Sequence, residues 1–543
     1  MKNFKKICVA IFILALGISS CKKFLDINSD PASPQKPTIA ALFPPLTGCM
    51  SRTMALDGRF SGAYIQNFSN TTLNDFIDQH GGNAPNGGGN QAWRDFFTVQ
   101  GTAINTIIEQ GIKDAQWDYV GAAFAVRAWG LQNATDIFSD LPYTQAWEKD
   151  RIFFKYDNQP KLYKTVDSLC RVALDYLSRS DGGVNNAVMA RGDLVYRGVK
   201  ANWIKFVYGL LARNWHHQSN KSDYNPDSVI NYVNRSMINN ADNFNIAHGG
   251  TRNDDTNPWG PARDNLGIRR QSRFIVQLLD GTSFYNNTLP SSRDPRLARM
   301  LSVSPDTSTI NANLVSLNGG YRFLIPSAGF LVGTIGNAFR QAPSTLWGDS
   351  VILNPGASNF NLNVGKYLFR NNAPFPIMTF FELQFIKAEA AFRKGDLSTA
   401  LAAYQAGIGG HLDYINTTNP TQPITLAERT AYLTSPAVKQ TAASLTLTDI
   451  MLQKYIGDFA WNFNESWCDM RRYHYFDIDP ITNAPVYRNF SIPTYSALNF
   501  GPRPAYRSRP TGFSENDWNF KELIRIGALN QDYHTYEMWF SQP

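Results

Sequence analysis

Apolar residues recur at steps of three and four along much of the chain, the spacing that places side chains on one face of a helix. Between residues 160 and 178 this stripe consists of Leu162, Val166, Leu169, Ala173 and Tyr176. Pro160 suits the first turn of a helix, and Asp181-Gly182-Gly183 follows the last periodic position. The pattern therefore predicts an amphipathic helix over 160–178.

The same periodicity predicts further helices at about 92–110, 117–137, 200–217, 226–240, 377–394, 397–408 and 447–472. Several of them follow one another after short turns, which is the arrangement of stacked helical hairpins. The sequence has no strict repeat of about 34 residues. We therefore predict a mainly α fold, with a tetratricopeptide-like scaffold of helical hairpins over about 90–240 and 377–472.

Two segments depart from this pattern, at about 241–376 and 474–520. Asn, Gly, Ser and Pro are dense there, and only short apolar runs such as 321–325 look like strands. Long loops on a rigid scaffold commonly carry binding surfaces. We predict that these segments form an irregular ligand-binding layer with small β elements, within a single body over 41–543.

The first twenty residues have the pattern of a secretory signal peptide. Lysines precede an apolar run from Ile7 to Ile18. As a helix this run would extend about 18 Å, which is too short for a hydrocarbon core of about 30 Å. We therefore predict a cleaved leader over 1–20.

The residues after the apolar run, Ile18-Ser19-Ser20-Cys21, resemble the bacterial lipobox. That resemblance implies that Cys21 carries a diacylglycerol and that its acyl chains, palmitate among them, hold the protein on a membrane. An ordinary cleavage site beside an unmodified Cys21 is the alternative. The polar, Pro-containing stretch 21–40 suits a tether between the anchor and the body.

Composition narrows the class of protein further. The 543 residues are 43% hydrophobic and 17% charged, with a mean hydropathy of -0.30, which excludes a multi-span membrane protein and a mostly disordered chain. A net charge of +7 spread over this length gives no reason to expect a nucleic-acid partner. Cys49, Cys170 and Cys468 are too far apart in the sequence for a disulfide framework and are predicted to be core residues.

Several segments together resemble the SusD/RagB-like outer-membrane lipoproteins, in the order in which that family has them. They are CKKFLDINSDPASP, NATDIFSDLPYTQAW, SSRDPRLARML, FFELQFIKAEAAFRKGDLSTALAAYQAGI, QKYIGDFAWNFNESWCDMRR and the terminal YEMWF. Ser139 stands where the family usually has glycine. The segment SRPTGFSENDWN follows the family pattern only loosely, at Pro510, Glu515 and Asn519. Lys22 and Lys23 replace the acidic residues often found after the lipid cysteine.

The resemblance implies a tetratricopeptide-like helical body with an irregular ligand-binding layer. It also implies an outer-membrane location in a Gram-negative bacterium, facing the cell exterior. The expected partners are a TonB-dependent outer-membrane transporter, on which the protein docks as a lid, and a glycan nutrient. A peptide ligand is the alternative within the same architecture.

No known catalytic constellation is present. The sequence lacks H-E-x-x-H and G-x-S-x-G, and the adjacent His216 and His217 point about 100° apart on a helix, so neither catalysis nor a metal site is predicted. Glu382 and Glu389 share a helix face at about 10.5 Å, beyond the separation of glycosidase carboxylates. We expect them to be buried with Lys, Arg or backbone partners. A glycoside hydrolase and a structural repeat adaptor are the alternatives from other classes.

The run Asn253-Asp254-Asp255-Thr256-Asn257 offers oxygen ligands that could suit calcium. It lacks the spaced acids, the glycine and the distal glutamate of an EF-hand, so a turn is the default interpretation. No cofactor is predicted, and calcium remains the alternative.

Aromatic residues beside polar ones are the candidate ligand contacts, because sugar rings stack on aromatic faces while their hydroxyls form hydrogen bonds. Indoles on predicted helices, such as those of Trp129, Trp203, Trp461 and Trp467, are expected in the core. We expect exposed indoles in the loops instead. The predicted ligand-binding set is Trp259, Trp347, Trp93, Tyr285, Phe284, Asn286, Arg252, Asp255 and Arg263.

Overall fold

The structure is a computed structural model that describes residues 37–81, 90–285, 294–304, 321–329, 343, 345–347, 365–493, 503–510 and 512–543. The predicted leader, Cys21 and most of the tether lie outside these residues, so their assignments remain predictions. Within the described part of the chain, no helix is both long and apolar enough to cross a membrane.

Helix α2 (Ile39–Tyr64) opens the described chain and was not predicted from the sequence. It begins where the tether was expected to end, and Thr38 caps it by accepting the N–H of Ala41. Pro44 and Pro45 lie inside the helix, and because proline normally interrupts helices, they conceal it in the sequence pattern. A side chain at Gly58 would lie 2.3 Å from the ring of Phe463, so this glycine permits close packing against helix α18 (Phe463–Arg472).

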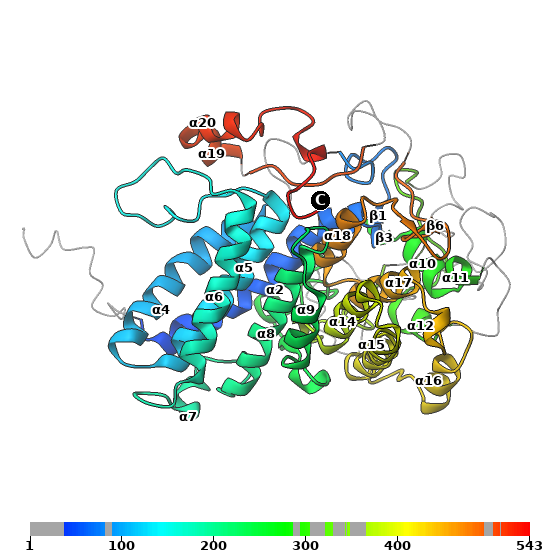
Figure 1. Cartoon of the computed structure of the whole chain (residues 1–543), viewed down its shortest axis with the longest axis horizontal. Coiled ribbons are helices and arrows are strands. Elements are labelled where there is room, and N and C mark those ends of the chain that lie inside the picture. The colour runs from blue at the N-terminus through cyan, green and yellow to red at the C-terminus, as the bar shows by residue number, and fades with distance from the viewer. Residues whose placement is uncertain are drawn as a thin grey trace, which may run out of the picture.

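The first part of the predicted scaffold is present with nearly the expected bounds. Figure 1 shows its long helices packed side by side as α4 (Gly101–Lys113), α5 (Trp117–Phe138), α6 (Gln159–Ser178), α8 (Lys200–His217) and α9 (Pro226–Asn234). The short helix α3 (Gln91–Arg94) and the π-helix η1 (Asp95–Gln100) precede α4, and α7 (Asn186–Met189) lies between α6 and α8. The mainly α prediction is therefore confirmed.

The second part of the scaffold comprises α14 (Phe380–Lys394), α15 (Leu397–Thr418), α16 (Leu426–Leu433), α17 (Leu447–Asp458) and α18. Thr379 and Glu382 form a capping box at the start of α14, and Gly395 ends that helix at a positive φ of 86°. The helix predicted over 447–472 is in fact the two helices α17 and α18, which are joined by a turn.

The irregular segments contain short elements only. Strand β1 (Phe68–Asn70) pairs with β3 (Arg269–Gln271), β2 (Phe244–Ile246) with β4 (Phe375–Met378), and β5 (Ile478–Asp479) with β6 (Ala484–Pro485), all antiparallel. The helices of these segments are α10 (Arg273–Leu279), α11 (Thr282–Tyr285), α12 (Arg296–Met300) and α19 (Gly512–Trp518), with the 3-10 turn η3 (Asn253–Asp255). The 3-10 turn η2 (Asn240–Asp242) and helix α20 (Phe520–Arg525) lie at their edges, and the 3-10 turns η5 (Ala442–Ser444) and η6 (Tyr533–Thr535) lie outside them. The strand expected over 321–325 is reduced to one bridge from Leu324 to Ser272.

One apolar core runs through both parts of the scaffold. The indoles of Trp129, Trp203, Trp461 and Trp467 are all buried in it, as predicted. Cys49, Cys170 and Cys468 are buried and free, also as predicted. Helices α19 and α20 lie above the upper ends of α5 and α6 in Figure 1, and this end of the molecule carries the candidate site.

Candidate functional site

Trp259, the central residue of the predicted site, is a core residue, so that prediction was wrong. Its side chain is 0% exposed and packs against the rings of Phe68 and Phe463. Its indole N–H donates to the carbonyl of Ala460 at 2.8 Å. The preceding turn directs it inward, because the side chain of Asn257 accepts the Trp259 backbone N–H. A loop-rich sequence does not by itself indicate an exposed indole, because large aromatics often anchor loops to a core.

Trp347 is also buried, at 4% exposure, so the expectation of an exposed indole was wrong there too. Phe284 and Tyr285 end helix α11, and the structure describes their backbone but not their side chains. Asn286 lies outside the described residues. Ligand contact by these last three residues remains a prediction.

Arg252, Asp255 and Arg263 lie on an exposed loop whose polar groups bond to one another. Asp255 accepts the backbone N–H of Arg252 at 2.9 Å, and Arg252 pairs with Asp254. Arg263 donates to the carbonyl of Asn253 at 3.0 Å. These contacts form the turn that the sequence predicted as the default for this run. Calcium binding there remains untested.

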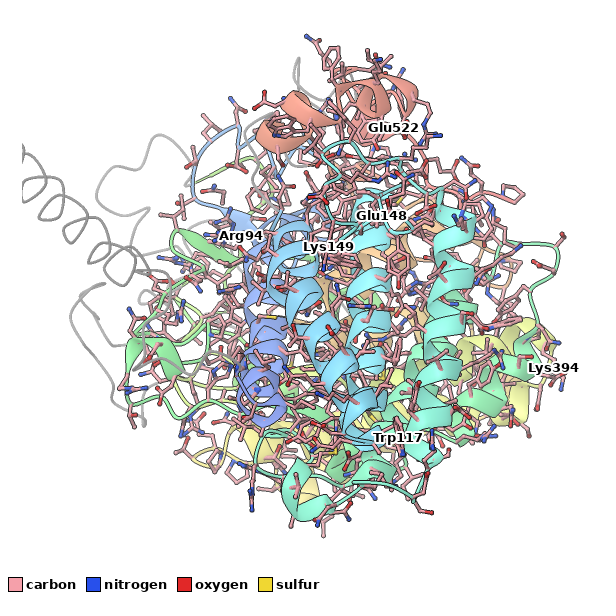
Figure 2. All side chains as sticks on the ribbon, turned by 90° about the vertical axis from the view of Figure 1, so that its left-hand side faces the viewer. Arg94, Trp117, Glu148, Lys149, Lys394 and Glu522 are labelled. Atoms are coloured by element: carbon pink, nitrogen blue, oxygen red, sulfur yellow. The ribbon has the colours of Figure 1, made fainter. Side chains whose placement is uncertain are left out.

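Trp93 is also buried, at 6% exposure on helix α3, so the expectation of an exposed loop indole was wrong for it as well. It does border a hollow of about 450 Å³ that most of the predicted residues do not reach. Aromatic rings form much of its wall, with polar groups at its edge. Its lining consists of Trp93, Arg94, Phe97, Thr98, Pro142, Ala146, Trp147, Phe154, Ser514, Glu515 and Asn519. We call this the aromatic hollow. Figure 2 shows Arg94 and Glu148 at the same end of the helical layer, below the helices that carry Glu522, while Trp117 lies at the other end.

Two buried carboxylates of the scaffold and its π-helix fix the position of Trp93. Asp57 on α2 accepts the backbone N–H groups of Gln91 and Ala92 at 2.8 and 2.7 Å, which caps the start of α3. Asp95, in the π-helix, accepts from Arg52 at 2.6 Å. Burial raises the pKa of Asp57 to about 7, although its two N–H donors act in the opposite direction. The residues just before and just after Trp93 are therefore both fixed by hydrogen bonds to helix α2.

The loop over residues 139–158 supplies the opposite wall of the aromatic hollow. A bridge between Leu141 and Asp157 closes its base. Trp147 in this loop has a φ of 64°, a region that a bulky residue rarely adopts. Its indole N–H donates to the carbonyl of Phe97 in the π-helix at 2.9 Å. A side chain at Gly101 would lie 2.2 Å from that indole nitrogen, so the glycine makes room for it.

Glu515 and Asn519, which follow the family pattern only loosely, form the third wall of the aromatic hollow. Asn519 accepts the backbone N–H of Phe154 at 2.8 Å and donates to Glu515 at 2.8 Å. The Tyr156 hydroxyl also donates to Glu515. Burial raises the pKa of the Glu515 carboxyl, while the two hydrogen bonds lower it. These contacts join helix α19 to the 139–158 loop, which is distant in sequence.

Exposed aromatic rings continue from the edge of the aromatic hollow. Phe153 is 59% exposed and Trp518 is 51% exposed, and their ring centroids lie 6.4 Å apart. Each is the chain neighbour of a residue that lines the aromatic hollow, Phe154 and Asn519 respectively. Exposed rings at this position offer a stacking surface beside the hollow.

A second hollow, of about 500 Å³, also borders Trp147. It shares Ala146 and Trp147 with the aromatic hollow and is otherwise mainly polar. Its remaining lining consists of Asn105, Arg127, Tyr143, Thr144, Glu148 and Thr165. We call this the polar hollow. Trp147 therefore borders two spaces, one mainly aromatic and one mainly polar.

Other parts of the described chain offer weaker sites. A larger hollow of about 760 Å³ beside Thr38 and Lys113 has Tyr119 as its single aromatic wall residue. The buried group Asp136, His217 and Cys468 has the donor atoms of a metal site. There, however, Asp136 accepts from Tyr163 and His217 Nε2 lies 2.8 Å from Glu465, so the polar atoms already have partners.

Glu382 and Glu389 are structural, as expected from their buried helix. Both are 0% exposed. Arg213 Nε lies 2.5 Å from Glu382, and the two Nη atoms of Arg472 lie 2.7 and 2.8 Å from Glu389. The prediction of arginine partners is confirmed.

Several aromatic residues at the aromatic hollow and its edge, which are absent from the predicted set, stand in recognisable sequence contexts. Trp147 ends the quoted segment NATDIFSDLPYTQAW, and Phe153 and Phe154 follow shortly after it. The connection between two strongly predicted helices, from 138 to 159, is unusually long for a compact domain, which commonly marks a functional loop. Trp518 lies between polar residues in SENDWN, the same kind of pattern that was used to select Trp259.

Comparison with known proteins gives matches to one family. The SusD-like family model, described as starch-binding and associating with the outer membrane, matches residues 31–494. No curated protein matches the sequence.

Among solved structures, a chitin-binding protein is similar with a TM-score of 0.68 at 20% identity, covering 93% of this chain and 100% of its own. A SusD homologue from Bacteroides fragilis gives 0.65 at 18% identity, with 92% and 100% covered. A SusD/RagB family protein from Bacteroides thetaiotaomicron gives 0.63 at 18% identity, with 92% and 98% covered. These likenesses show a shared fold. With the family match over most of its length, the chain belongs to the SusD-like family of the outer membrane.

Proposed function

We propose that this protein is a lipid-anchored receptor of the outer membrane that binds an oligosaccharide and delivers it to a TonB-dependent transporter. The ligand lies across the aromatic hollow, between Trp93, Phe97 and Trp147. The protein acts by binding, without chemical change of the ligand. The family's description as starch-binding and the chitin-binding neighbour both support a glycan ligand.

The observation that carries the proposal is the combination of rings and polar groups around one space. Trp93 and Phe97 have ring centroids 5.0 Å apart, and Phe97 and Trp147 have theirs 6.0 Å apart. Sugars present apolar C–H faces to such rings and hydroxyls to neighbouring amide, hydroxyl and guanidinium groups. Arg94 and Asn519 supply polar groups of that kind. Phe153 and Trp518 extend the surface for a longer chain.

A peptide receptor of the same architecture would be favoured if the predicted aromatics were buried and the exposed cleft were lined instead by arginines and backbone groups. The burial of Trp259 and Trp347 removes two of the predicted rings, but the walls of the aromatic hollow replace them. We therefore favour a glycan. The two buried glutamates of α14 are paired with arginines, which supports binding over glycoside hydrolysis.

Isothermal titration against malto-, chito-, xylo- and uronate-containing oligosaccharides, with a peptide library as a further arm, tests the ligand class. We expect at least one oligosaccharide to bind, and Trp147→Ala to weaken that binding by about tenfold or more, because burial of a large apolar side chain contributes about 1.5–3 kcal/mol. Trp117→Ala is the matched control. Its ring also packs against an arginine, with Arg179 Cζ at 4.0 Å, but lies at the opposite end of the helices.

Three outcomes would contradict the proposal. The first is heat from peptides and none from glycans, and the second is equal loss of binding in Trp117→Ala and Trp147→Ala. The third is release of reducing sugar from a bound oligosaccharide, which would indicate an enzyme.

The anchor and the transporter need separate tests. Metabolic labelling with palmitate should label the wild-type protein, and Cys21→Ser should remove the label. Purification from detergent-solubilised outer membranes should yield a stoichiometric barrel protein. An unlabelled product, or isolation without a barrel partner, would contradict the corresponding part of the proposal.

A further inference from the structure

The polar hollow contains a buried arginine whose charge has no counterion. Arg127, on α5, is 9% exposed and lines the polar hollow. It forms no ion pair with any residue that the structure describes. A buried guanidinium without a carboxylate partner destabilises the folded protein, so its presence in the polar hollow requires an explanation.

The hydrogen bonds of Arg127 are also incomplete. Its Nη2 atom donates to Asn105 at 2.6 Å and to the carbonyl of Gly101 at 3.4 Å. Its Nε N–H is buried and has no acceptor among the described residues. By contrast, the buried Arg471 also lacks a carboxylate but donates to three carbonyls, those of Trp467, Asp136 and Tyr506. Arg127 is thus left with unused donor capacity beside an open space.

The acidic groups near the polar hollow already have cations of their own. Glu148, which lines it, pairs with Arg151 at 2.6 Å. Asp157, which is bonded to the lining residue Thr144, pairs with Lys161 at 2.6 Å. Neither carboxylate lies within ion-pair distance of Arg127. The positive charge of Arg127 therefore faces this space without local compensation.

Trp147 connects this charge to the aromatic hollow. The Arg127 Cζ atom lies 5.0 Å from the Trp147 ring centroid, and that ring borders both hollows. Its position is fixed by the bond to Phe97 and by the close approach at Gly101. If a sugar ring of the ligand stacked on Trp147 in the aromatic hollow, a substituent of that ring or of the next one would lie in the polar hollow.

We propose that the polar hollow binds the anionic substituent, a carboxylate or a sulfate, of an acidic oligosaccharide, with Arg127 as its counterion. The inference rests on the proposed function, because it assumes that the aromatic hollow holds the rest of the same glycan. Arginine suits this role because its planar fork matches a carboxylate or sulfate with two parallel hydrogen bonds. The ligand class is therefore narrowed from oligosaccharides in general to those that carry uronate or sulfate groups.

The test compares acidic oligosaccharides with their own neutralised forms. The probes are oligogalacturonate, oligomannuronate and chondroitin sulfate fragments, each beside its methyl-esterified or desulfated counterpart, together with neutral malto-, xylo- and chito-oligosaccharides. Titrations in low salt should show at least one acidic probe that binds about tenfold tighter than its neutralised form. Comparison of the uronate probes with the sulfated probes shows whether the polar hollow prefers a carboxylate or a sulfate.

Variants then assign the preference to one side chain. Arg127→Gln should abolish the acidic preference while leaving binding of the neutralised form within about twofold. Arg127→Lys should keep part of the preference, since it retains the charge but loses the fork. Lys149→Gln is the matched control, because it removes an equal charge from an exposed residue of the 139–158 loop that does not line the polar hollow, and it should preserve the preference. Thermal unfolding of each variant shows that it is folded.

The outcomes separate this inference from the proposed function. Neutral oligosaccharides that bind as tightly as every acidic probe, with no effect of Arg127→Gln on charge preference, would overturn the inference and leave a glycan receptor. A preference lost equally in Arg127→Gln and Lys149→Gln would also overturn it, since net charge would then be the cause. Binding of no glycan at all would overturn both.

Discussion

Buried arginines occur in two regions of this protein, and their partners differ. In the scaffold around α14, Arg472 contacts both Glu389 and Asp469, and Arg213 contacts Glu382. In the middle of α5, Arg127 is almost as deeply buried but has an amide and a carbonyl as its only described acceptors. Burial alone does not distinguish the two kinds of arginine. An arginine whose charge is paired with carboxylates stabilises the fold, whereas Arg127, without such partners, is available to a ligand.

Removing one partner in the scaffold should have the largest effect on stability. Glu389→Gln keeps the shape of the side chain but leaves Arg472 and its neighbours without one of their carboxylates. Loss of one member of a buried ion pair costs about 3–5 kcal/mol, and we expect a decrease in the free energy of unfolding of that size. Denaturation in guanidinium chloride measures it.

The matched control breaks an ion pair whose lysine lies on the same helix, α14. Asp227→Ala breaks the exposed pair with Lys394, whose two side chains are 65% and 42% exposed, and should leave stability nearly unchanged. If both variants lost equal stability, the distinction between paired scaffold charges and surface charges would fail.

The scaffold network should also make stability depend on pH. Burial alone would lower the pKa of His217, but the carboxylates of Glu465 and Asp136 raise it to about 9. Because this value lies above the ordinary 6.5, the stabilisation is complete below pH 6.5 and is lost as the pH rises through about 9. The shift corresponds to about 3 kcal/mol. Urea unfolding at several pH values between 6 and 10 should show the decline.

The neighbouring histidine provides the control for that experiment. Burial lowers the pKa of His216 to about 4, so it stays neutral throughout this range. His217→Gln should flatten the decline between pH 6.5 and 9, and His216→Gln should preserve it. An unchanged slope in His217→Gln would assign the pH dependence to other groups.

The scaffold was predictable from the sequence because its signals are local. The stripe over 160–178 became α6, which runs from Gln159 to Ser178, since helical periodicity and capping residues are read within one segment. Helix α2 was missed where prolines masked the same signal. The family resemblance, carried by segments spread along the whole chain, was confirmed by the family match.

The site was less predictable because its walls come from distant segments. Trp259 and Trp518 stand in similar polar surroundings in the sequence, yet one is 0% and the other 51% exposed. Only the fold decides this, through contacts such as that of Asn519 with Phe154. Trp93 was selected for its position beside a Gly-rich loop, and it does border the aromatic hollow. Its partner Trp147 is positioned by a π-helix that no simple periodicity indicates.

A carboxylate that positions the ligand site should have an intermediate effect on stability and a clear one on binding. Asp57→Asn replaces one of the two oxygens that accept the N–H groups at the start of α3. Loss of such a cap costs about 0.5–2 kcal/mol. Because α3 carries Trp93, we also expect glycan affinity to fall, measured by titration of the folded variant.

A similar cap far from the aromatic hollow is the control for that variant. Asn185 accepts the N–H groups of Ala187 and Val188 at the start of the equally short helix α7. Asn185→Ala should cost comparable stability and leave affinity unchanged. If both variants lost affinity to the same extent, the effect would come from general destabilisation and Asp57 would have no special part in positioning Trp93.

The smallest effect on stability should come from the residue with the most specific effect on binding. Arg127→Gln removes two hydrogen bonds, each worth about 1 kcal/mol, but it also removes a buried cation whose desolvation costs several kcal/mol. These contributions oppose each other, so we expect the free energy of unfolding to change by less than about 1 kcal/mol while the preference for acidic ligands disappears. A loss of about 3–5 kcal/mol, as expected for Glu389→Gln, would show that Arg127 belongs to the stabilising charges. The contrast between the two regions would then have no functional meaning.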